Sequence, residues 1–205
     1  MSKNFPTYYT HEKELKKYFK KMKSEIEVKI ELTPEEFETF TNGLNDLYFE
    51  RTFGYFKEDF SNIKEGIFPR IKYIEDKNGN KEIILTVKRK TKDNTHFFER
   101  EEMEVKIQKE ENVEILREIL KSLGFNKEII FEKKRKNIIK DDIIISFDKL
   151  PFGFFVEFEA EPEVINKYID KFNLSNRPRI TKAYLGLWED YKTMHNINED
   201  NCIFK

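Results

Sequence analysis

The sequence alternates charged and apolar residues in several separate stretches, and the charged positions of each stretch carry mostly one sign. In residues 25–30, Glu25, Glu27 and Lys29 alternate with isoleucine and valine. Side chains point alternately to the two faces of a β-strand, so a period of two predicts a strand with one charged face and one apolar face. An amphipathic helix would instead place apolar residues three or four positions apart.

The same two-residue period recurs along the chain. For any single strand, a solvated outer face is the simpler interpretation, because lysine and glutamate are the commonest exposed residues. Charged faces on seven strands, some acidic and some basic, predict one shared compartment instead: a barrel with a charged lumen and an apolar outside covered by helices. Unpaired buried charges are costly, so such a lumen needs water, metal ions and a charged ligand. The later charged positions are Arg70, Lys72, Lys88, Lys90, Arg100, Glu102, Glu104, Lys133, Arg135, Asp148, Glu157 and Glu159.

Composition excludes several classes of protein. No apolar run approaches the roughly 20 residues that a membrane-spanning helix needs, and 20 Phe with 9 Tyr are too many for a disordered chain. With 38 Lys+Arg against 39 Asp+Glu, no basic excess favours nucleic acid. The single cysteine, Cys202, excludes an internal disulfide framework, and the first residues lack the apolar stretch of a signal peptide. We therefore expect a cytoplasmic protein whose Cys202 lies in a mobile tail.

Periodicity and turn residues divide the chain into an N-terminal helical extension at 1–24, a domain at 25–191 and a tail at 192–205. In the extension, apolar residues recur at helical spacing between residues 12 and 23. A long, partly apolar loop is expected after residue 51, up to residue 69. The fold class is α+β. Strands are predicted at 25–32, 47–51, 70–75, 82–90, 97–107, 128–137, 142–148 and 154–161, and helices at 33–44, 112–123, 162–172 and 182–191.

These residues, in this order, resemble the CYTH domain of the triphosphate tunnel metalloenzyme superfamily. The signature Glu-x-Glu-x-Lys stands at Glu25-Ile26-Glu27-Val28-Lys29, and residues 148–159 (DKLPFGFFVEFE) are similar to the family's Phe-Val-Glu-x-Glu segment with its preceding aspartate and glycine turn. The segment 183–187 (AYLGL) resembles the family's closing Ser-Tyr-x-x-Leu, with Ala183 in place of serine. Lys72 stands where arginine is commoner, which keeps the charge and loses the bidentate geometry.

The resemblance implies an eight-stranded antiparallel tunnel that binds a triphosphate together with one or two Mg²⁺ or Mn²⁺ ions. Carried over by position, the metal ligands would be Glu25, Glu27, Asp148, Glu157 and Glu159. The residues that bind phosphate would be Lys29, Arg70, Lys72, Lys88, Lys133, Arg135 and Lys182. The catalytic set would be Lys29, Arg100, Glu102 and Glu104, with the two glutamates as further ligands or as residues that position water.

Three functions remain open at this point. The intact carboxylate pairs at 102/104 and 157/159 favour a metal-dependent triphosphatase that acts on inorganic triphosphate, thiamine triphosphate or a nucleoside triphosphate. The first alternative is a class IV adenylate cyclase, which converts ATP to cyclic AMP and pyrophosphate, and the second is a non-catalytic module that binds triphosphate or polyphosphate. We expect a monomer or a homodimer that engages neither membrane nor nucleic acid.

Overall fold

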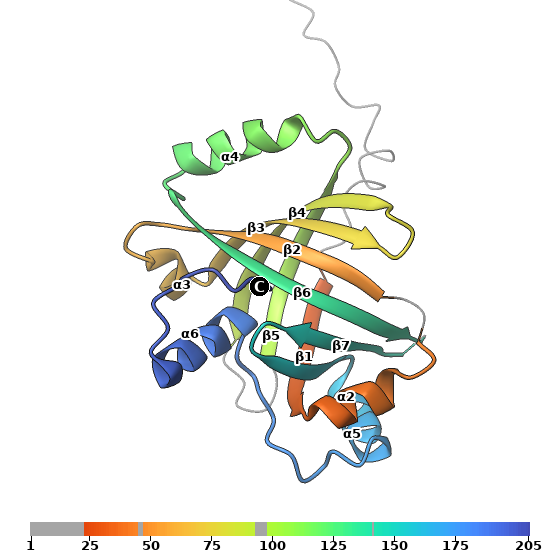
Figure 1. The fold of residues 1–205 in the computed structure, drawn as a ribbon. Helices are drawn as coiled ribbons and strands as arrows, with labels where there is room; N and C mark the ends of the chain where they lie inside the picture. Colours follow the sequence, from red (N-terminus) through yellow and green to blue (C-terminus); the bar gives the residue numbers. More distant parts are fainter. Residues whose placement is uncertain (1–22, 45–46, 93–97, 141) are drawn as a thin grey trace, which may run out of the picture.

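The structure, a computed structural model, describes residues 23–44, 47–92, 98–140 and 142–205 (Figure 1). The helix predicted within residues 1–24 lies outside them. Among the described residues, no helix is both long and apolar enough to cross a membrane. The strands are β1 (Lys23–Leu32), β2 (Leu47–Phe56), β3 (Ile67–Asp76), β4 (Lys81–Lys92), β5 (Phe98–Ile107), β6 (Lys127–Ile139), β7 (Ile144–Leu150) and β8 (Gly153–Glu159). The helices are α2 (Pro34–Thr41), α3 (Ser61–Glu65), α4 (Asn112–Ser122), α5 (Pro162–Lys171) and α6 (Tyr184–His195).

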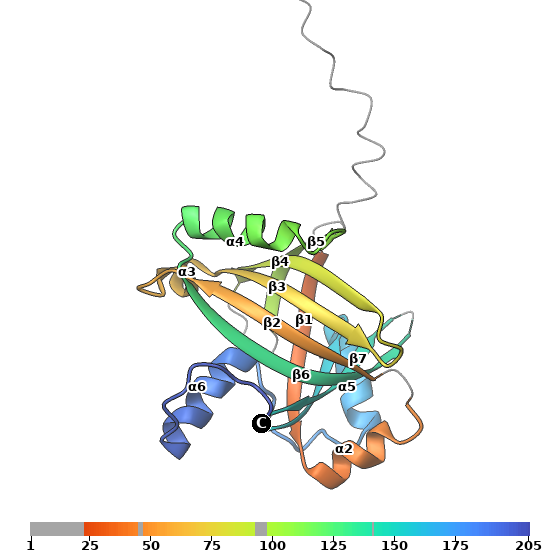
Figure 2. The ribbon, with the colours of Figure 1, turned by 45° about the horizontal axis from the view of Figure 1, so that its top comes forward.

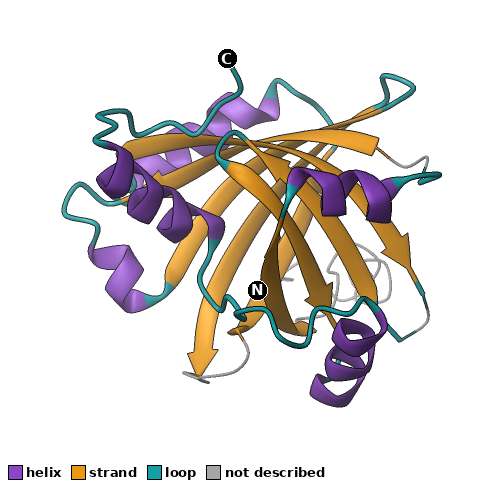
Figure 3. Ribbon diagram, turned by 60° about the horizontal axis from the view of Figure 1, so that its bottom comes forward, coloured by secondary structure: helices purple, strands orange, loops and turns teal. Residues whose placement is uncertain are grey.

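The strands form a closed antiparallel barrel in the order β1-β5-β4-β3-β2-β6-β7-β8. The ring closes where β8 pairs with β1, with Val28 opposite Phe158 and Lys29 opposite Glu157. Helices lie on the outside of the strands (Figure 3). The barrel expected from the alternating charges is therefore confirmed, as are the eight antiparallel strands that the resemblance implied.

One apolar core lies between the β1, β7 and β8 side of the barrel and helices α2 and α5. Val28 and Ile30 of β1 are fully buried in this core together with Phe158. Phe37 reaches it from α2 and Ile165 from α5. Helix α2 begins at a capping box, in which the Thr33 hydroxyl accepts from the Glu36 backbone N–H and the Glu36 carboxylate accepts from that of Thr33. Because these apolar side chains face outward, their charged neighbours on β1 face the lumen.

A second core lies beneath α4, the helix that connects β5 to β6 along the chain and crosses the outside of the barrel (Figure 2). Val113 and Leu120 of α4 pack against Ile71 of β3 and Ile83 of β4. The helix ends at Gly124, whose φ of +89° is a left-handed conformation that glycine adopts without strain. The helix predicted at 112–123 is thus confirmed.

The long loop expected at residues 52–69 is wrong. Strand β2 continues to Phe56, the short helix α3 follows, and β3 already begins at Ile67. Aromatic residues occupy both faces of β2, so the two-residue period is not visible in the sequence. Gly54 resembles a break in the strand pattern, yet it lies within β2. A Cβ at this position would stand 3.2 Å from the Phe56 ring, so glycine leaves room for that ring.

The C-terminal residues are not a mobile tail. Cys202 is completely buried and forms a parallel bridge with Phe131 of β6. Its backbone N–H donates to the Ile130 carbonyl, and the Glu132 N–H donates to the Cys202 carbonyl. Strand β7 pairs with β6 only from Lys134 onward, so the terminal residues cover the edge of β6 that β7 leaves open.

Candidate active site

The barrel encloses a cavity of about 760 Å³ whose wall comes from the strands and from the start of α6. Most of the charged lining residues occupy alternate positions of their strands, as the period of two predicted. They come from elements that are far apart in the sequence but adjacent in the ring. The charged residues of the wall are Glu27, Lys29, Glu50, Arg70, Lys72, Lys88, Glu102, Lys127, Lys133, Arg135, Glu157, Lys182, Glu189 and Asp200.

Lysine and arginine side chains from three strands converge on this cavity. Lys133 and Arg135 come from β6, Arg70 and Lys72 from β3, and Lys88 from β4. Lys133 and Lys88 are buried, so their charges act in a medium that screens less than water. A cluster of buried cations is a suitable site for a polyanion such as a chain of phosphates.

Carboxylates from β1 and β8 face the same cavity beside these cations. Lys29 Nζ lies 2.5 Å from Glu27 Oε1 and 3.5 Å from Glu157 Oε2, and all three residues are buried. Lys29 Nζ also lies 5.3 Å from the centre of the Tyr184 ring. Lys29 therefore sits between the two glutamates of the predicted metal side.

Arg135 is held by the predicted metal ligand Asp148. Its Nε lies 2.5 Å from Asp148 Oδ1, and Nη2 donates to Oδ2. The Tyr184 hydroxyl donates to Oδ2 as well, at 2.8 Å. Burial alone would raise the pKa of Asp148, but Arg135 and Lys133 lower it below the ordinary value. Asp148 therefore remains ionised and already has a donor on each oxygen, and it does not line the cavity itself.

Glu50 of β2 is a cavity carboxylate that the sequence analysis missed. Burial would raise its pKa, but Lys133, Lys72 and Arg135 lower it to about 2. Its Oε1 lies 3.5 Å from Lys133 Nζ and accepts a hydrogen bond of 2.8 Å from the Thr52 hydroxyl. The signal was the alternation of Glu50, Thr52 and Gly54, which aromatic neighbours obscured.

Two lysine–glutamate pairs join the cation side to β5. Lys72 Nζ lies 2.7 Å from Glu104 Oε1, and Lys88 Nζ lies 3.4 Å from Glu102 Oε1. Burial lowers the pKa of Lys72, but Glu50, Glu104 and Glu102 outweigh it, so the pKa of Lys72 is raised. Lys72 therefore keeps its charge inside the barrel.

Lys182 lies at the rim, just before α6. Its ammonium group binds Asp190 at 2.6 and 2.7 Å, and its side chain is half exposed. The stem of Lys182 passes over Gly186, where an added Cβ would come within 2.8 Å of the Lys182 Cε. Glycine at this position thus gives the lysine room to lie along the first turn of α6.

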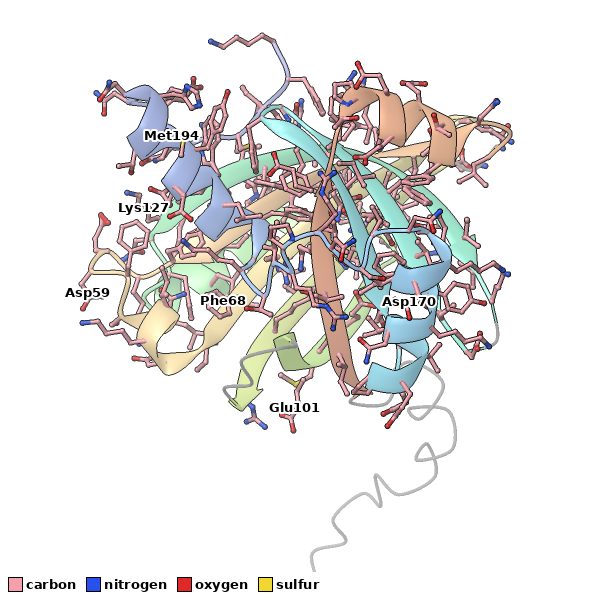
Figure 4. The ribbon with its side chains drawn as sticks, turned by 90° about the horizontal axis from the view of Figure 1, so that it is seen from below. Asp59, Phe68, Glu101, Lys127, Asp170 and Met194 are labelled. Carbon is pink, nitrogen blue, oxygen red and sulfur yellow. The ribbon has the colours of Figure 1, made fainter. Side chains whose placement is uncertain are left out.

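One part of the cavity wall is apolar and aromatic, and we call it the vestibule. Its residues come from β2, α3, β3 and β6, and Lys127 lies among them. Figure 4 shows Phe68 and Lys127 on the side of the barrel that carries α3 and α6. A surface of this kind suits a flat organic group attached to a charged chain. The vestibule comprises Phe56, Phe60, Ile63, Phe68, Ile129 and Phe131.

The donor set of the cavity fits a hard divalent cation. Glu27, Glu102 and Glu157 all turn carboxylate oxygens into the cavity, and such oxygens are the ligands that Mg²⁺ and Mn²⁺ prefer. Glu102 Oε1 is buried and accepts no hydrogen bond from a described residue. No three acidic, histidine or cysteine side chains among the described residues are already gathered as a metal cluster. Cation binding would therefore require the glutamates to shift away from their lysine partners.

The structure brings ten of the predicted site residues onto one cavity wall: Glu27, Lys29, Arg70, Lys72, Lys88, Glu102, Lys133, Arg135, Glu157 and Lys182. Glu104 and Asp148 contact wall residues without lining the cavity, and Glu159 lies beyond it, opposite Glu27 on β1. Glu25 and Arg100 are register partners on β1 and β5, and their side chains lie outside the described part of the chain.

A family model described as "CYTH domain" matches residues 23–183 of this chain. These residues include the barrel and end just before α6. The chain belongs to the CYTH family. No curated protein matches this member of the family.

Solved structures show the same fold. The PH1819 protein from Pyrococcus horikoshii OT3 is 26% identical with a TM-score of 0.67, and the match covers 82% of this chain and 99% of that one. A candidate adenylate cyclase from Vibrio parahaemolyticus is 16% identical, with a TM-score of 0.60 and coverage of 82% and 99%. HpAC1 from Hippeastrum, a candidate adenylyl cyclase described as having a dominant triphosphatase activity, is 14% identical, with a TM-score of 0.56 and coverage of 83% and 96%.

Proposed function

We propose that this CYTH protein is a divalent-metal-dependent triphosphatase that hydrolyses the terminal phosphate of a triphosphate inside the barrel. One observation carries the proposal: buried cations and carboxylates line the same cavity side by side. Phosphoryl transfer is catalysed mainly by positioning and by charge neutralisation, and this arrangement supplies both. The description of HpAC1 as a triphosphatase supports the choice.

The basic and the acidic residues of the cavity would have different roles. Lys133, Arg135 and Arg70 would bind the phosphate oxygens and neutralise the negative charge that develops on the transferred group. Glu27 and Glu157 would hold Mg²⁺ or Mn²⁺, which when bound polarises a phosphate oxygen and lowers the pKa of water. Glu102, whose Oε1 is a buried acceptor, would orient the water that attacks the terminal phosphorus. The bond between that phosphorus and its bridging oxygen then breaks, which releases orthophosphate.

The vestibule favours a substrate that carries an organic group. The cavity of about 760 Å³ falls within the roughly 300–1,000 Å³ typical of pockets for drug-sized ligands. Phe68 and Phe131 would contact the organic part while the cations hold the phosphates. We therefore place nucleoside and thiamine triphosphates before inorganic triphosphate as substrates.

The same vestibule supports a second candidate function, a class IV adenylate cyclase. If an adenine ring occupies the vestibule, a ribose hydroxyl can attack the α-phosphorus and release pyrophosphate from the same cation cluster. The candidate adenylate cyclase from Vibrio parahaemolyticus shares the fold. The two reactions differ in their products and are separated by product analysis.

The deciding experiment supplies the purified protein with ATP, thiamine triphosphate and inorganic triphosphate, each with Mg²⁺ and with Mn²⁺. Orthophosphate is the expected product, with the organic triphosphates turned over faster than the inorganic one. Cyclic AMP together with pyrophosphate would show the cyclase instead. Tight triphosphate binding without turnover would leave only a binding module, and a chelator should abolish turnover in either enzyme.

Variants of the site assignment need a matched surface control. Glu27→Ala and Glu157→Ala should abolish metal-dependent turnover with the fold intact, whereas Glu38→Ala on the exposed face of α2 should leave it unchanged. Arg135→Ala should chiefly weaken the apparent triphosphate affinity. Normal turnover in Glu27→Ala would exclude that residue from the metal side.

A further inference from the structure

Exposed apolar side chains gather on one outer surface, which we call the α4–β5 shelf. Its members are Ile115 and Ile119 on α4, Leu123 directly after that helix, and Met103 and Val105 on β5. These side chains are 40–64% exposed, and they make up five of the nine strongly exposed large apolar side chains in the described part of the chain. Scattered exposed apolar residues are ordinary, but a gathered set usually marks a surface that binds something.

Contacts of Arg117 fix the direction in which the shelf faces. Arg117 Nη1 lies 3.1 Å from Glu128 of β6, and its guanidinium lies 4.7 Å from the centre of the Phe53 ring on β2. The Arg117 side of α4 therefore faces β2 and β6. Ile119 and Leu123 project from the opposite flank of the helix, toward the side where β4 and β5 lie. Val105 is the register partner of Leu85, which packs in the core beneath α4, so the exposed apolar residues of β5 lie beside the helix.

The backbone edge of β5 is open beside this shelf. Strand β1 pairs with β5 from Glu27 opposite Phe98 to Lys23 opposite Glu102. Beyond that point, Met103 to Ile107 pair with β4 on one side, and no described strand pairs with their other side. Because β1 runs antiparallel to β5, Lys23, the first described residue of β1, lies beside this open edge.

The sequence of residues 12–22 is complementary to the shelf. Its apolar residues Leu15, Tyr18, Phe19 and Met22 follow helical spacing, and residues 12–23 contain six lysines against two glutamates. The exposed glutamates beside the shelf are already paired with bases: Glu111 with Lys109, Glu114 with Arg117 and Glu118 with Lys121. The match between the segment and the shelf is therefore apolar, and the lysines of the segment would remain in solvent.

We propose that residues 12–22 form an amphipathic helix that docks on the α4–β5 shelf of the same molecule. The match to the Pyrococcus horikoshii structure covers 99% of that chain but 82% of this one, so part of this chain is an addition to the fold they share. The family match likewise begins only at residue 23. The shelf is then the surface that this addition covers, and the proposal is independent of the reaction that the barrel catalyses.

Hydrogen exchange of the full-length protein, followed by mass spectrometry, tests the proposal. In the wild type, amides of residues 12–22 should exchange at least about tenfold more slowly than in an unstructured peptide of that sequence, because docking protects them. The double variant Ile115→Asp/Ile119→Asp should lose this protection. Ile139→Asp, which changes an equally exposed isoleucine at the far end of β6, should keep it.

A variant within residues 12–22 keeps the test valid if the double variant of the shelf does not fold. Phe19→Asp leaves the shelf intact and should raise exchange in both residues 12–22 and α4. Light scattering should show the same molar mass for the wild type and all variants. Unprotected residues 12–22 in the wild type would overturn the proposal. So would a dimer that dissociates in the double variant without any change in residues 12–22, since a second copy would then occupy the shelf.

Discussion

Arg135 and Asp148 form a two-point ion pair in the barrel wall, with Nε 2.5 Å from Oδ1 and Nη2 donating to Oδ2. Asp148 is 0% exposed. Burial lowers the pKa of Arg135, but Asp148 and Glu157 outweigh it and raise the pKa well above the ordinary value. Both partners therefore carry full charge, and the pair fixes the direction in which the guanidinium faces the cavity. Under the proposed function, Asp148 would act on a bound phosphate through Arg135.

Asp148→Asn should uncouple this pair. The variant leaves the Arg135 charge buried with Glu157 as its remaining carboxylate, 3.5 Å away. Removing one partner of a buried ion pair typically costs about 3–5 kcal/mol, so the free energy of unfolding should fall by an amount of that order. Denaturant unfolding measures this loss, and Asp190→Asn, at the exposed partner of Lys182, is the control. Unfolding unchanged from the wild type would show that Glu157 alone is enough to hold Arg135.

Glu50→Gln should strengthen triphosphate binding several-fold in the absence of metal. Glu50 places a negative charge 3.5 Å from Lys133, and removing it makes the cation cluster more positive for an incoming polyanion. With a pKa of about 2, Glu50 is ionised throughout an ordinary assay range, so the effect should not vary between pH 6 and pH 9.

Calorimetric titration with inorganic triphosphate measures this change. Glu132→Gln is the matched control, because Glu132 is also a buried glutamate but pairs with Arg51 on the outside of the barrel. Weaker binding in Glu50→Gln would show instead that Glu50 is needed to hold Lys133 in place.

Much of the barrel follows from the sequence because a period of two is a strong constraint. Glu27 and Lys29 alternate with buried valine and isoleucine, and only a strand with one lumenal face satisfies both sets. The grouping of Lys133, Arg135 and Glu157 on one wall could be predicted for the same reason, since closing the sheet leaves one interior for all charged faces.

The sequence was less informative where both faces of a strand carry apolar residues, and where two residues that contact each other lie far apart in the sequence. Glu50 was missed because Phe49, Phe53 and Tyr55 hide the alternation of β2. The buried position of Cys202 depends on backbone bonds to β6, about seventy residues away, and no local pattern encodes such bonds. The prediction of Asp148 as a metal ligand rests on a pattern of residue types, which could not show that both of its oxygens already have donors.

Phe68→Ala should discriminate between organic and inorganic substrates. Phe68 lines the vestibule and not the carboxylate side, so the loss should fall on contacts to an organic group. A base–aromatic contact is worth about 1–3 kcal/mol, which corresponds to roughly a fivefold to hundredfold loss of kcat/KM. Turnover of inorganic triphosphate should stay within about twofold of the wild type. Equal losses for both substrates would show that Phe68 supports the barrel and not the substrate.

Cys202 should be nearly inert toward thiol reagents in the folded protein. Burial, with a smaller effect of the nearby Glu132 carboxylate, raises its pKa to about 12, and the reactive thiolate is therefore scarce at pH 8. Alkylation by iodoacetamide at pH 8 should be slow without denaturant and fast in concentrated urea.

Because the C-terminal residues bind the edge of β6, Asn201→Ala, which removes the acceptor for the Ile130 N–H, should accelerate alkylation of the folded protein. Ser175→Ala, on an exposed turn far along the chain, should not. Rapid alkylation of the wild type would mean that the terminal residues leave β6 readily in solution.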